Sequence, residues 1–201
     1  MMEWTAFEDQ ARTEGYTCIC GIDEAGRGPL AGPVYAAAVV LRPGQVIAGV
    51  NDSKKLSEKK RETLFDAICS QCAAYGIGSA TEKEIDEINI LNATYLAMQR
   101  AVAALPVQPD CALVDGNRAP DLPLEVRTII KGDAQSASIA AASILAKVSR
   151  DRYMLQMAEK YPQYAFEKHK GYGTKLHYER LEQYGISPIH RLSFLKKWMN
   201  R

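Results

Sequence analysis

Four acidic side chains that each follow an apolar stretch are the residues of this sequence best suited to chemistry. Asp23 and Glu24 stand at the end of one such stretch, Asp115 ends a second, and Asp133 comes shortly after a third. Each stretch predicts a strand, and ligand sites in open α/β sheets lie at strand ends. A single aspartate in such a place is commonly a turn residue or a helix cap. Carboxylates at three strand ends indicate a shared site.

The donor atoms at these positions indicate which ion the site would hold. Carboxylate oxygens without histidine or cysteine are hard ligands, which suit Mg²⁺ or Mn²⁺. His169, His177 and His190 are too few and too scattered in the sequence to predict a metal site of their own. We therefore predict Mn²⁺ or Mg²⁺ as cofactor. Two such ions held by carboxylates are the apparatus of phosphodiester cleavage.

Basic and glycine-rich segments in the same sequence are suited to a phosphate chain. Arg27 lies between Gly26 and Gly28, and glycines let the backbone approach a ligand closely. Residues 51–61 carry five lysines and arginines, and Tyr172 stands between two glycines in a basic loop. Aromatic side chains in such loops often stack on nucleotides. Taken singly, most of these cations are ordinary surface charge.

The charge of the chain is unevenly distributed along its 201 residues. Residues 1–146 carry 13 Lys and Arg against 19 Asp and Glu, whereas residues 147–201 carry 12 against 5. An acidic body with a basic C-terminal quarter is typical of a carboxylate site that faces a polyanion. A solvated basic helical surface explains the charge alone equally well.

An alternation of strands and helices must position these side chains. The apolar runs and turn residues predict strands at 17–23, 34–41, 75–79, 111–115 and 125–130. They predict a helix at 58–72, a short helix that begins at 81, a longer helix with an apolar stripe from 91 to 105, and helices at 136–158, at 174–184 and after 193. Strands alternating with helices, followed by helices only, indicate an α/β layered domain with a helical C-terminal addition. The bend at 25–33 is too short for a crossover helix, which predicts an antiparallel first pair and a mixed sheet.

The sequence also excludes several locations and classes. Its longest apolar run, 34–41, is far shorter than the roughly 20 residues of a membrane helix. The acidic N-terminus has no apolar signal segment, and five cysteines are an odd number. We expect a cytoplasmic protein without membrane contact, in which all five cysteines are buried small hydrophobic residues.

Seven motifs in a fixed order resemble those of ribonuclease HII, the bacterial type 2 ribonuclease H family. They are Gly-Ile-Asp-Glu-Ala-Gly-Arg-Gly-Pro-Leu-Ala-Gly-Pro at 21–33, Asn-Asp-Ser-Lys-Lys-Leu at 51–56, Val-Asp-Gly at 114–116, Lys-Gly-Asp at 131–133, Ala-Ala-Ser-Ile-Leu-Ala-Lys-Val at 141–148, His-Lys-Gly-Tyr-Gly-Thr at 169–174 and Ile-His-Arg-Leu-Ser-Phe at 189–194. Their order and spacing are much more specific than any one of them.

The resemblance implies a fold, an activity and site residues. The fold would be a ribonuclease H-like three-layer α/β/α arrangement with a mixed five-stranded sheet, in one domain over 1–201. About 1–16 would be an N-terminal segment, and about 160–201 a helical part that contributes to substrate binding. The family's four acids fall on Asp23, Glu24, Asp115 and Asp133, and would bind two divalent ions. One ion activates water and the other stabilises the leaving 3′ oxygen.

The same resemblance implies how the substrate is read. The activity would be an endonuclease that hydrolyses the RNA strand of RNA/DNA hybrids and incises 5′ to single ribonucleotides in duplex DNA. The backbone of Gly26, Arg27 and Gly28 would read the 2′-hydroxyl, and Tyr172 would contact the RNA–DNA junction.

Further residues of these motifs are predicted to contact or support the substrate site. We predict that Asn51, Ser53, Lys54 and Lys147 contact the substrate. We predict that two other residues act indirectly, Asp151 as a partner of Lys147 and His169 as a support of the substrate loop. Asp151 is four residues after Lys147 on the same predicted helix, which favours a pair over a metal ligand.

Three alternatives remain open at the level of sequence. They are a non-catalytic nucleic-acid-binding module, another metal-dependent ribonuclease H-like nuclease, and a small-molecule metal phosphatase. The acidic set disfavours the first, since carboxylates repel phosphates unless metals intervene. The basic C-terminal quarter and the Tyr172 loop disfavour the last. We expect the protein to act as a monomer.

Overall fold

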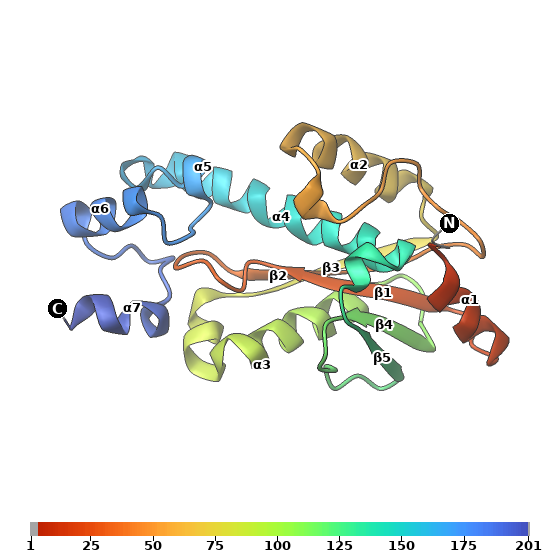
Figure 1. The fold of residues 1–201 in the computed structure, drawn as a ribbon. Coiled ribbons are helices and arrows are strands. Elements are labelled where there is room, and N and C mark those ends of the chain that lie inside the picture. Colours follow the sequence, from red (N-terminus) through yellow and green to blue (C-terminus); the bar gives the residue numbers. More distant parts are fainter. Residues whose placement is uncertain (1–3, 201) are drawn as a thin grey trace.

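The computed structural model describes residues 4–200 and contains a mixed five-stranded sheet. The strand order is β3-β2-β1-β4-β5 (Figure 1). The strands are β1 (Ile19–Ala25), β2 (Val34–Val40), β3 (Ala74–Ala80), β4 (Cys111–Asp115) and β5 (Glu125–Ile129). β1 pairs antiparallel with β2 and parallel with β4, β2 pairs antiparallel with β3, and β4 pairs parallel with β5. The predicted mixed sheet and its antiparallel first pair are confirmed.

Helices cover both faces of this sheet (Figure 1). α2 (Glu58–Gln71) and α4 (Ala137–Lys160) lie on one face, and α3 (Glu82–Ala103) lies on the other. β2 alternates its apolar side chains between the two layers, so that Ala36 and Ala38 join the α3 core while Ala37 and Val39 join the α4 core. A strand buried on both faces has a continuous apolar sequence, which explains the unbroken apolar run at 34–41.

The two helices predicted from residue 81 onward form one bent element. Thr81 caps its start. The Glu84 amide donates to the Thr81 hydroxyl, and the Thr81 amide donates to the Glu84 carboxylate. Asn89 has a φ of 67° and interrupts the helical geometry. Its side-chain oxygen accepts hydrogen bonds from the amides of Leu91 and Asn92, so it starts the second segment as an N-cap does.

A short N-terminal helix, which the sequence analysis did not predict, packs beside the sheet. α1 (Ala6–Thr13) places Glu8 in the interior, at 2% exposure. One carboxylate oxygen of Glu8 accepts bonds from the hydroxyls of Ser136 and Ser138 and from the Ser138 amide. These donors lie at the N-terminus of α4, where a negative charge is favourable. α1 therefore fixes the start of the helix that underlies the site.

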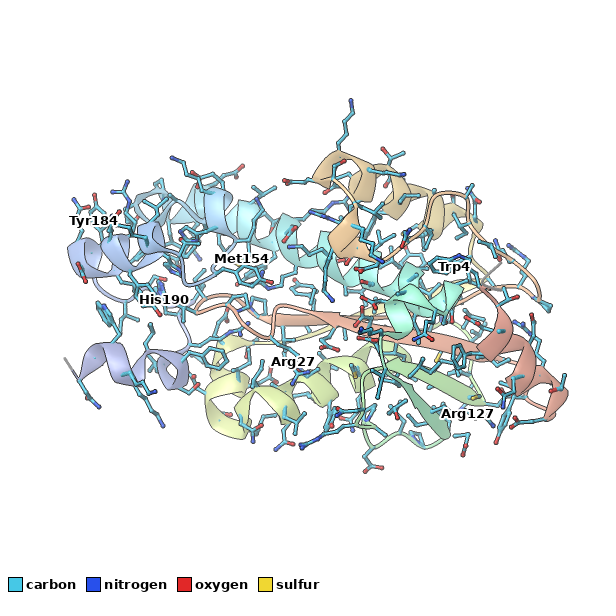
Figure 2. The ribbon with its side chains drawn as sticks, in the orientation of Figure 1. Trp4, Arg27, Arg127, Met154, Tyr184 and His190 are labelled. Carbon is cyan, nitrogen blue, oxygen red and sulfur yellow. The ribbon has the colours of Figure 1, made fainter. Side chains whose placement is uncertain are left out.

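The C-terminal helices form a third apolar core beyond the end of α4. They are α5 (Phe166–His169), α6 (Lys175–Tyr184) and α7 (Leu192–Met199). Phe166, Leu181 and Leu195 pack there with Met154 of α4. Figure 2 shows Met154 and His190 near the end of the β1–β2 hairpin that faces these helices. Single 3₁₀ turns occur at η1 (Ser53–Lys55), η2 (Gly132–Ala134) and η3 (Pro162–Tyr164).

Two further expectations concern the cysteines and membranes. All five cysteines are free, and Cys20, Cys72 and Cys111 are buried as expected. Cys18 and Cys69 are only half-buried, so the expectation of five buried cysteines is wrong. Cys18 stands just before β1 and Cys69 lies in the last turn of α2, and each packs against an apolar core while part of its surface stays exposed. Among residues 4–200, no helix combines the length and apolarity needed to cross a bilayer.

Candidate active site

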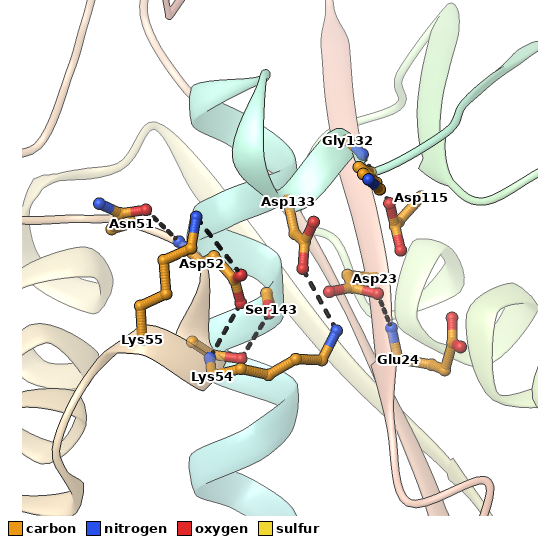
Figure 3. A network of polar contacts seen from close by, with 12 residues as sticks. Asp23, Glu24, Asn51, Asp52, Lys54, Lys55, Asp115, Gly132, Asp133 and Ser143 are labelled. Atoms are coloured by element: carbon orange, nitrogen blue, oxygen red, sulfur yellow. Dashed lines mark hydrogen bonds and ion pairs between the residues drawn. The ribbon is translucent and has the colours of Figure 1, made fainter.

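Three of the four predicted acids converge at adjacent strand ends. One carboxylate oxygen each from Asp23, Asp115 and Asp133 lies within 4.8 Å of the others (Figure 3). Asp23 is in β1, Asp115 ends the neighbouring β4, and Asp133 lies in the 3₁₀ turn η2 that follows β5. Parallel pairing of β1 with β4 brings the first two together.

Backbone bonds orient the aspartate side chains. The Gly132 amide donates to an Asp115 carboxylate oxygen at 2.6 Å, which ties the η2 turn to the end of β4. The Glu24 amide donates to Asp23 at 2.7 Å. Lys131, just before η2, has a φ of 57°, so the chain turns sharply there and directs Asp133 back toward the sheet. The cluster is therefore held by main-chain geometry as well as by strand order.

The electrostatics of the cluster favour neutralisation by a cation. Asp23 and Asp133 are 4% and 5% exposed. Burial raises the pKa of Asp23 well above its ordinary value, and the charges of Glu24 and Asp115 raise it further. Burial and the charge of Asp133 likewise raise the pKa of Asp115. Bringing ionised carboxylates this close without a counter-ion costs free energy, which a bound cation would recover.

Glu24 lies outside the group of three. Its carboxylate stands to one side in Figure 3 and pairs with Arg27 at 3.4 Å. Burial raises the pKa of Glu24, whereas the adjacent Arg27 charge opposes that rise. Glu24 is still within β1, which ends at Ala25. Successive residues of a strand point to opposite faces, so the side chain of Glu24 points away from that of Asp23.

The segment that contains Asn51, Ser53 and Lys54 approaches the cluster from the other side. Lys54 Nζ lies 3.4 Å from an Asp133 oxygen and is the cation nearest the aspartates (Figure 3). Burial of the Lys54 ammonium lowers its pKa, but the charges of Asp133 and Asp23 outweigh this effect and raise the pKa of Lys54. Ser53 is buried, and its hydroxyl is 2.7 Å from the Ser143 hydroxyl on α4. Asn51 accepts a bond from the Asp52 amide and turns away from the aspartates.

The Gly26–Gly28 backbone and Tyr172 border the same cleft. The cleft has a volume of about 250 Å³. A Cβ built on Gly28 would lie 3.9 Å from a Tyr172 ring carbon. Tyr172 is 43% exposed, so its ring is available to a ligand. The side chains and backbone that line the cleft come from Asp23, Glu24, Ala25, Gly26, Arg27, Gly28, Ser53, Lys54, Asp115, Ser143, Lys147 and Tyr172.

The two residues predicted to act indirectly do contact their expected neighbours. Lys147 Nζ donates to Asp151 at 2.7 Å, and Asp151 is buried outside the aspartate cluster. His169 accepts the Gly171 amide on Nδ1 and lies 3.0 Å from the Tyr164 carbonyl through Nε2. Both contacts of His169 fix the turn that presents Tyr172. Because Nδ1 accepts the Gly171 amide, it carries no proton and the ring is neutral, and burial lowers the pKa of His169 in the same sense.

The three histidines, scattered in the sequence, are adjacent in the fold. The rings of His169 and His177 stack with centroids 4.4 Å apart, and the Nε2 atoms of His177 and His190 are 2.9 Å apart. Their separation in the sequence gave no sign of this proximity. His190 accepts the Ser187 amide on Nδ1, so its Nε2 carries the proton donated to His177. His177 Nδ1 then donates to the Tyr172 carbonyl.

The sequence analysis missed two residues that support the cleft. Ser143 contacts Ser53 and lines the cleft. Arg61 donates to the carbonyls of Ser53 and Leu56 and so holds the η1 turn. Ser143 lies within the motif at 141–148, which was a usable signal, whereas Arg61 was counted only among the basic residues of 51–61, without this role.

The donor set fits divalent metal ions of the hard class. It consists of carboxylate oxygens from three elements, with no sulfur or imidazole among the clustered groups. Such sets suit Mg²⁺ and Mn²⁺. Burial and then the neighbouring carboxylates raise the pKa of Asp23 and of Asp115, so a cation at this place would stabilise the ionised forms.

Comparisons with known proteins agree with this geometry. The family model described as Ribonuclease HII matches residues 20–197. Ribonuclease HII of Caldicellulosiruptor bescii is 59% identical over 94% of this chain and 92% of its own length. Ribonuclease HII of Marinomonas sp. is 61% identical over 88% of this chain and 89% of its own length. The crystal structure of ribonuclease H2 from Pyrococcus horikoshii has a TM-score of 0.74 at 28% identity, and the match covers 92% of this chain and 100% of that chain.

Proposed function

The chain belongs to the ribonuclease HII family and is an endoribonuclease that acts on the RNA of RNA/DNA hybrids; from this premise we propose which residues perform the reaction. Asp23, Asp115 and Asp133 hold the divalent ions, and Glu24 completes the set. The observation that carries this assignment is the approach of three buried carboxylates to within 4.8 Å of one another. Glu24 joins them by exchanging its pairing with Arg27 for the ions.

We propose Mg²⁺ or Mn²⁺ as the ions, two at a time. When bound, they supply activation of water and stabilisation of the leaving 3′ oxygen. The chain's own groups orient the substrate. Lys54 and Lys147 line the cleft and contact phosphates there, whereas Asn51, which turns away from the aspartates, contacts a phosphate outside the cleft. Ser53 fixes the η1 turn through Ser143. The products carry a 3′-hydroxyl and a 5′-phosphate.

Recognition of the ribose is assigned to the backbone of residues 26–28. Among the described residues, neither the Arg27 amide nor the Gly28 amide donates a hydrogen bond to another protein group. Both residues line the cleft. Two free donors at one place suit the oxygen of a 2′-hydroxyl, which deoxyribose lacks. This supports incision 5′ to a single ribonucleotide in duplex DNA.

Tyr172 completes the proposed recognition from the opposite wall. Its partly exposed ring faces Gly28, so a sugar bound to the 26–28 backbone would lie against it. The C-terminal part from about residue 160 thereby contributes to substrate binding, and the enzyme acts as a monomer.

One incubation tests the proposed function. Labelled duplex DNA with a single ribonucleotide is incubated with the protein, with and without Mg²⁺ or Mn²⁺. We expect a cut at the 5′ side of the ribonucleotide only when a divalent ion is present. Binding without cutting in every condition would instead favour a non-catalytic module. An uncut duplex, together with release of phosphate from a small phosphate ester in a parallel reaction, would favour a metal phosphatase.

A further inference from the structure

Two arginines are completely buried against the bend that follows β1. Arg150 and Arg191 have an exposure of 0%. Among residues 4–200, neither arginine has a carboxylate oxygen within 4.0 Å of its guanidinium nitrogens. Buried charges are normally paired with an opposite charge, so these two need another explanation. Burial and the nearby charge of Arg150 lower the pKa of Arg191 to about 9, which leaves its guanidinium cationic at neutral pH.

Backbone carbonyls take the place of a carboxylate partner for Arg191. Its Nη2 donates to the Gly26 carbonyl at 2.6 Å, its Nη1 to the Arg27 carbonyl at 2.9 Å, and its Nε to the Gly32 carbonyl at 2.8 Å. The bend is thereby closed around one planar fork. Arg150 holds other carbonyls of the bend, those of Ala31 and Pro33.

The bonds from Arg191 determine the direction of two amides. In a trans peptide the C=O of one residue and the N–H of the next point in opposite directions. A Gly26 carbonyl directed at Arg191 therefore directs the Arg27 N–H away from it, and the Arg27 carbonyl does the same for the Gly28 N–H. Neither of these amides has a protein acceptor within residues 4–200.

Arg191 is itself held firmly from two sides. Its own amide donates to the Leu30 carbonyl at 2.8 Å, and the Gly32 amide donates to the Ile189 carbonyl at 2.9 Å. Asp86 on α3 accepts the amides of Leu192 and Ser193 and so fixes the start of α7. A fork anchored in this way can impose its geometry on the bend.

We propose that Arg191 is a positioning residue for ribose recognition, because its guanidinium holds the carbonyls of Gly26 and Arg27 and thereby aims the amides of Arg27 and Gly28 at the 2′-hydroxyl. This inference rests on the proposed recognition by residues 26–28. It assigns a role to the Ile-His-Arg motif at 189–191. The chemistry requires arginine, since a lysine ammonium is a point charge and lacks the planar fork that reaches three acceptors at once.

The test compares Arg191→Lys with the parent protein. Both are made with Asp115→Asn, which is expected to bind without cutting. Affinity is measured for two duplexes that are identical except for one ribonucleotide or deoxyribonucleotide. We expect the parent to prefer the ribonucleotide duplex and Arg191→Lys to lose about tenfold of that preference, because two hydrogen bonds are misaligned. Affinity for the all-DNA duplex should stay within about twofold.

Leu195→Ala is the matched control. Leu195 is buried in the same C-terminal core at 1% exposure, but it has no polar contact with the bend. It should lower the unfolding temperature while leaving the ribose preference intact. A general loss of stability therefore cannot imitate the expected result.

The outcomes separate this inference from the proposed function. No ribose preference in the parent would refute recognition by residues 26–28. A parental preference that a folded Arg191→Lys retains would refute the role of Arg191 alone. If the lysine variant does not fold, Arg191→Gln replaces it under the same criteria. Failure of both to fold would reduce Arg191 to a structural residue and overturn the inference.

Discussion

Substitution of Gly28 by alanine should impair cleavage without destabilising the protein, and the same change at Gly26 should destabilise it. At Gly28 the nearest atom to a new Cβ is a Tyr172 ring carbon at 3.9 Å, which is ordinary contact. Gly28 is also absent from the residues with positive φ. At Gly26 the φ is +97°, and a Cβ would lie 2.1 Å from Nε of the buried Arg150. The sequence alone treats the two glycines alike.

The expected magnitudes follow from these contacts. Gly28→Ala should change the free energy of unfolding by less than about 0.5 kcal/mol. Its methyl group projects into the space between the bend and Tyr172, so it should displace the bound sugar from one or both amides. Each hydrogen bond lost is worth about 0.5–1.5 kcal/mol, or about 2- to 13-fold in kcat/KM. Gly26→Ala should cost about 1–3 kcal/mol of stability from backbone strain, before the contact with Arg150 is counted.

The assay measures urea unfolding and kcat/KM on a single-ribonucleotide duplex for both variants. Gly15→Ala serves as a control for strain, because Gly15 has a φ of +103° and no atom within 4 Å of a new Cβ. Gly26→Ala should be less stable than Gly15→Ala by the cost of moving Arg150. Wild-type kcat/KM in a stable Gly28→Ala would refute the assignment of ribose recognition to this backbone. Equal stability of the Gly26 and Gly15 variants would refute the contact argument.

Three further predictions concern the aspartates, the tyrosine and the histidines. Asp23→Asn removes one negative ligand while keeping the shape, so cleavage should collapse while duplex binding, measured by titration, persists or tightens; near-normal turnover would contradict the metal site. Tyr172→Ala should lose about 1–3 kcal/mol from a lost stack, more on a single ribonucleotide than on a long hybrid and with an unchanged salt dependence; equal kinetic losses on both substrates would remove Tyr172 from junction recognition. Burial lowers the pKa of His177 and His190 to about 4, from an ordinary value of about 6.5. The stability that depends on their neutral forms is present above about pH 6.5 and is lost as the pH falls toward 4. His190→Gln should therefore lower the free energy of unfolding more at about pH 7.5 than at about pH 5. Equal losses at both pH values would contradict hydrogen bonding between the neutral rings.

Local patterns in the sequence predicted most of the elements for physical reasons. The doubly buried β2 appears as an unbroken apolar run, and the Thr81–Glu84 pair marks a helix start. α1 was missed because distant contacts hold it, those of Glu8 with the serines that begin α4 and those of Ala11 with the sheet. A single acid in an amphipathic segment resembles surface charge until its partner is known.

The candidate site was predictable to the extent that it depends on strand ends. Adjacent strands place their terminal carboxylates together, which is why Asp23, Asp115 and Asp133 were identified as a group. Glu24 could not be separated from Asp23 by sequence, since its direction depends on where the strand bends. Hydrogen bonds across the tertiary structure leave no periodicity, so the chain of histidines and the carbonyl partners of Arg191 were beyond this kind of reasoning.

The covalent connection between β1 and the bend would couple ribose recognition to the position of the phosphodiester that is cut. Asp23 belongs to β1, and Arg27 follows it by four residues, a separation of at most about 14 Å in extended chain. Nucleotides on one strand rise about 3.4 Å each along the helix axis, so a ribose bound by the Arg27 and Gly28 amides, as proposed, would lie within a few nucleotides of a phosphodiester at the aspartates. Arg191 holds the carbonyls of the bend and strand pairing holds Asp23, so the proposed arrangement predicts a constant offset between the bound ribose and the cut. A constant offset would place the cut at one position relative to the bound ribonucleotide.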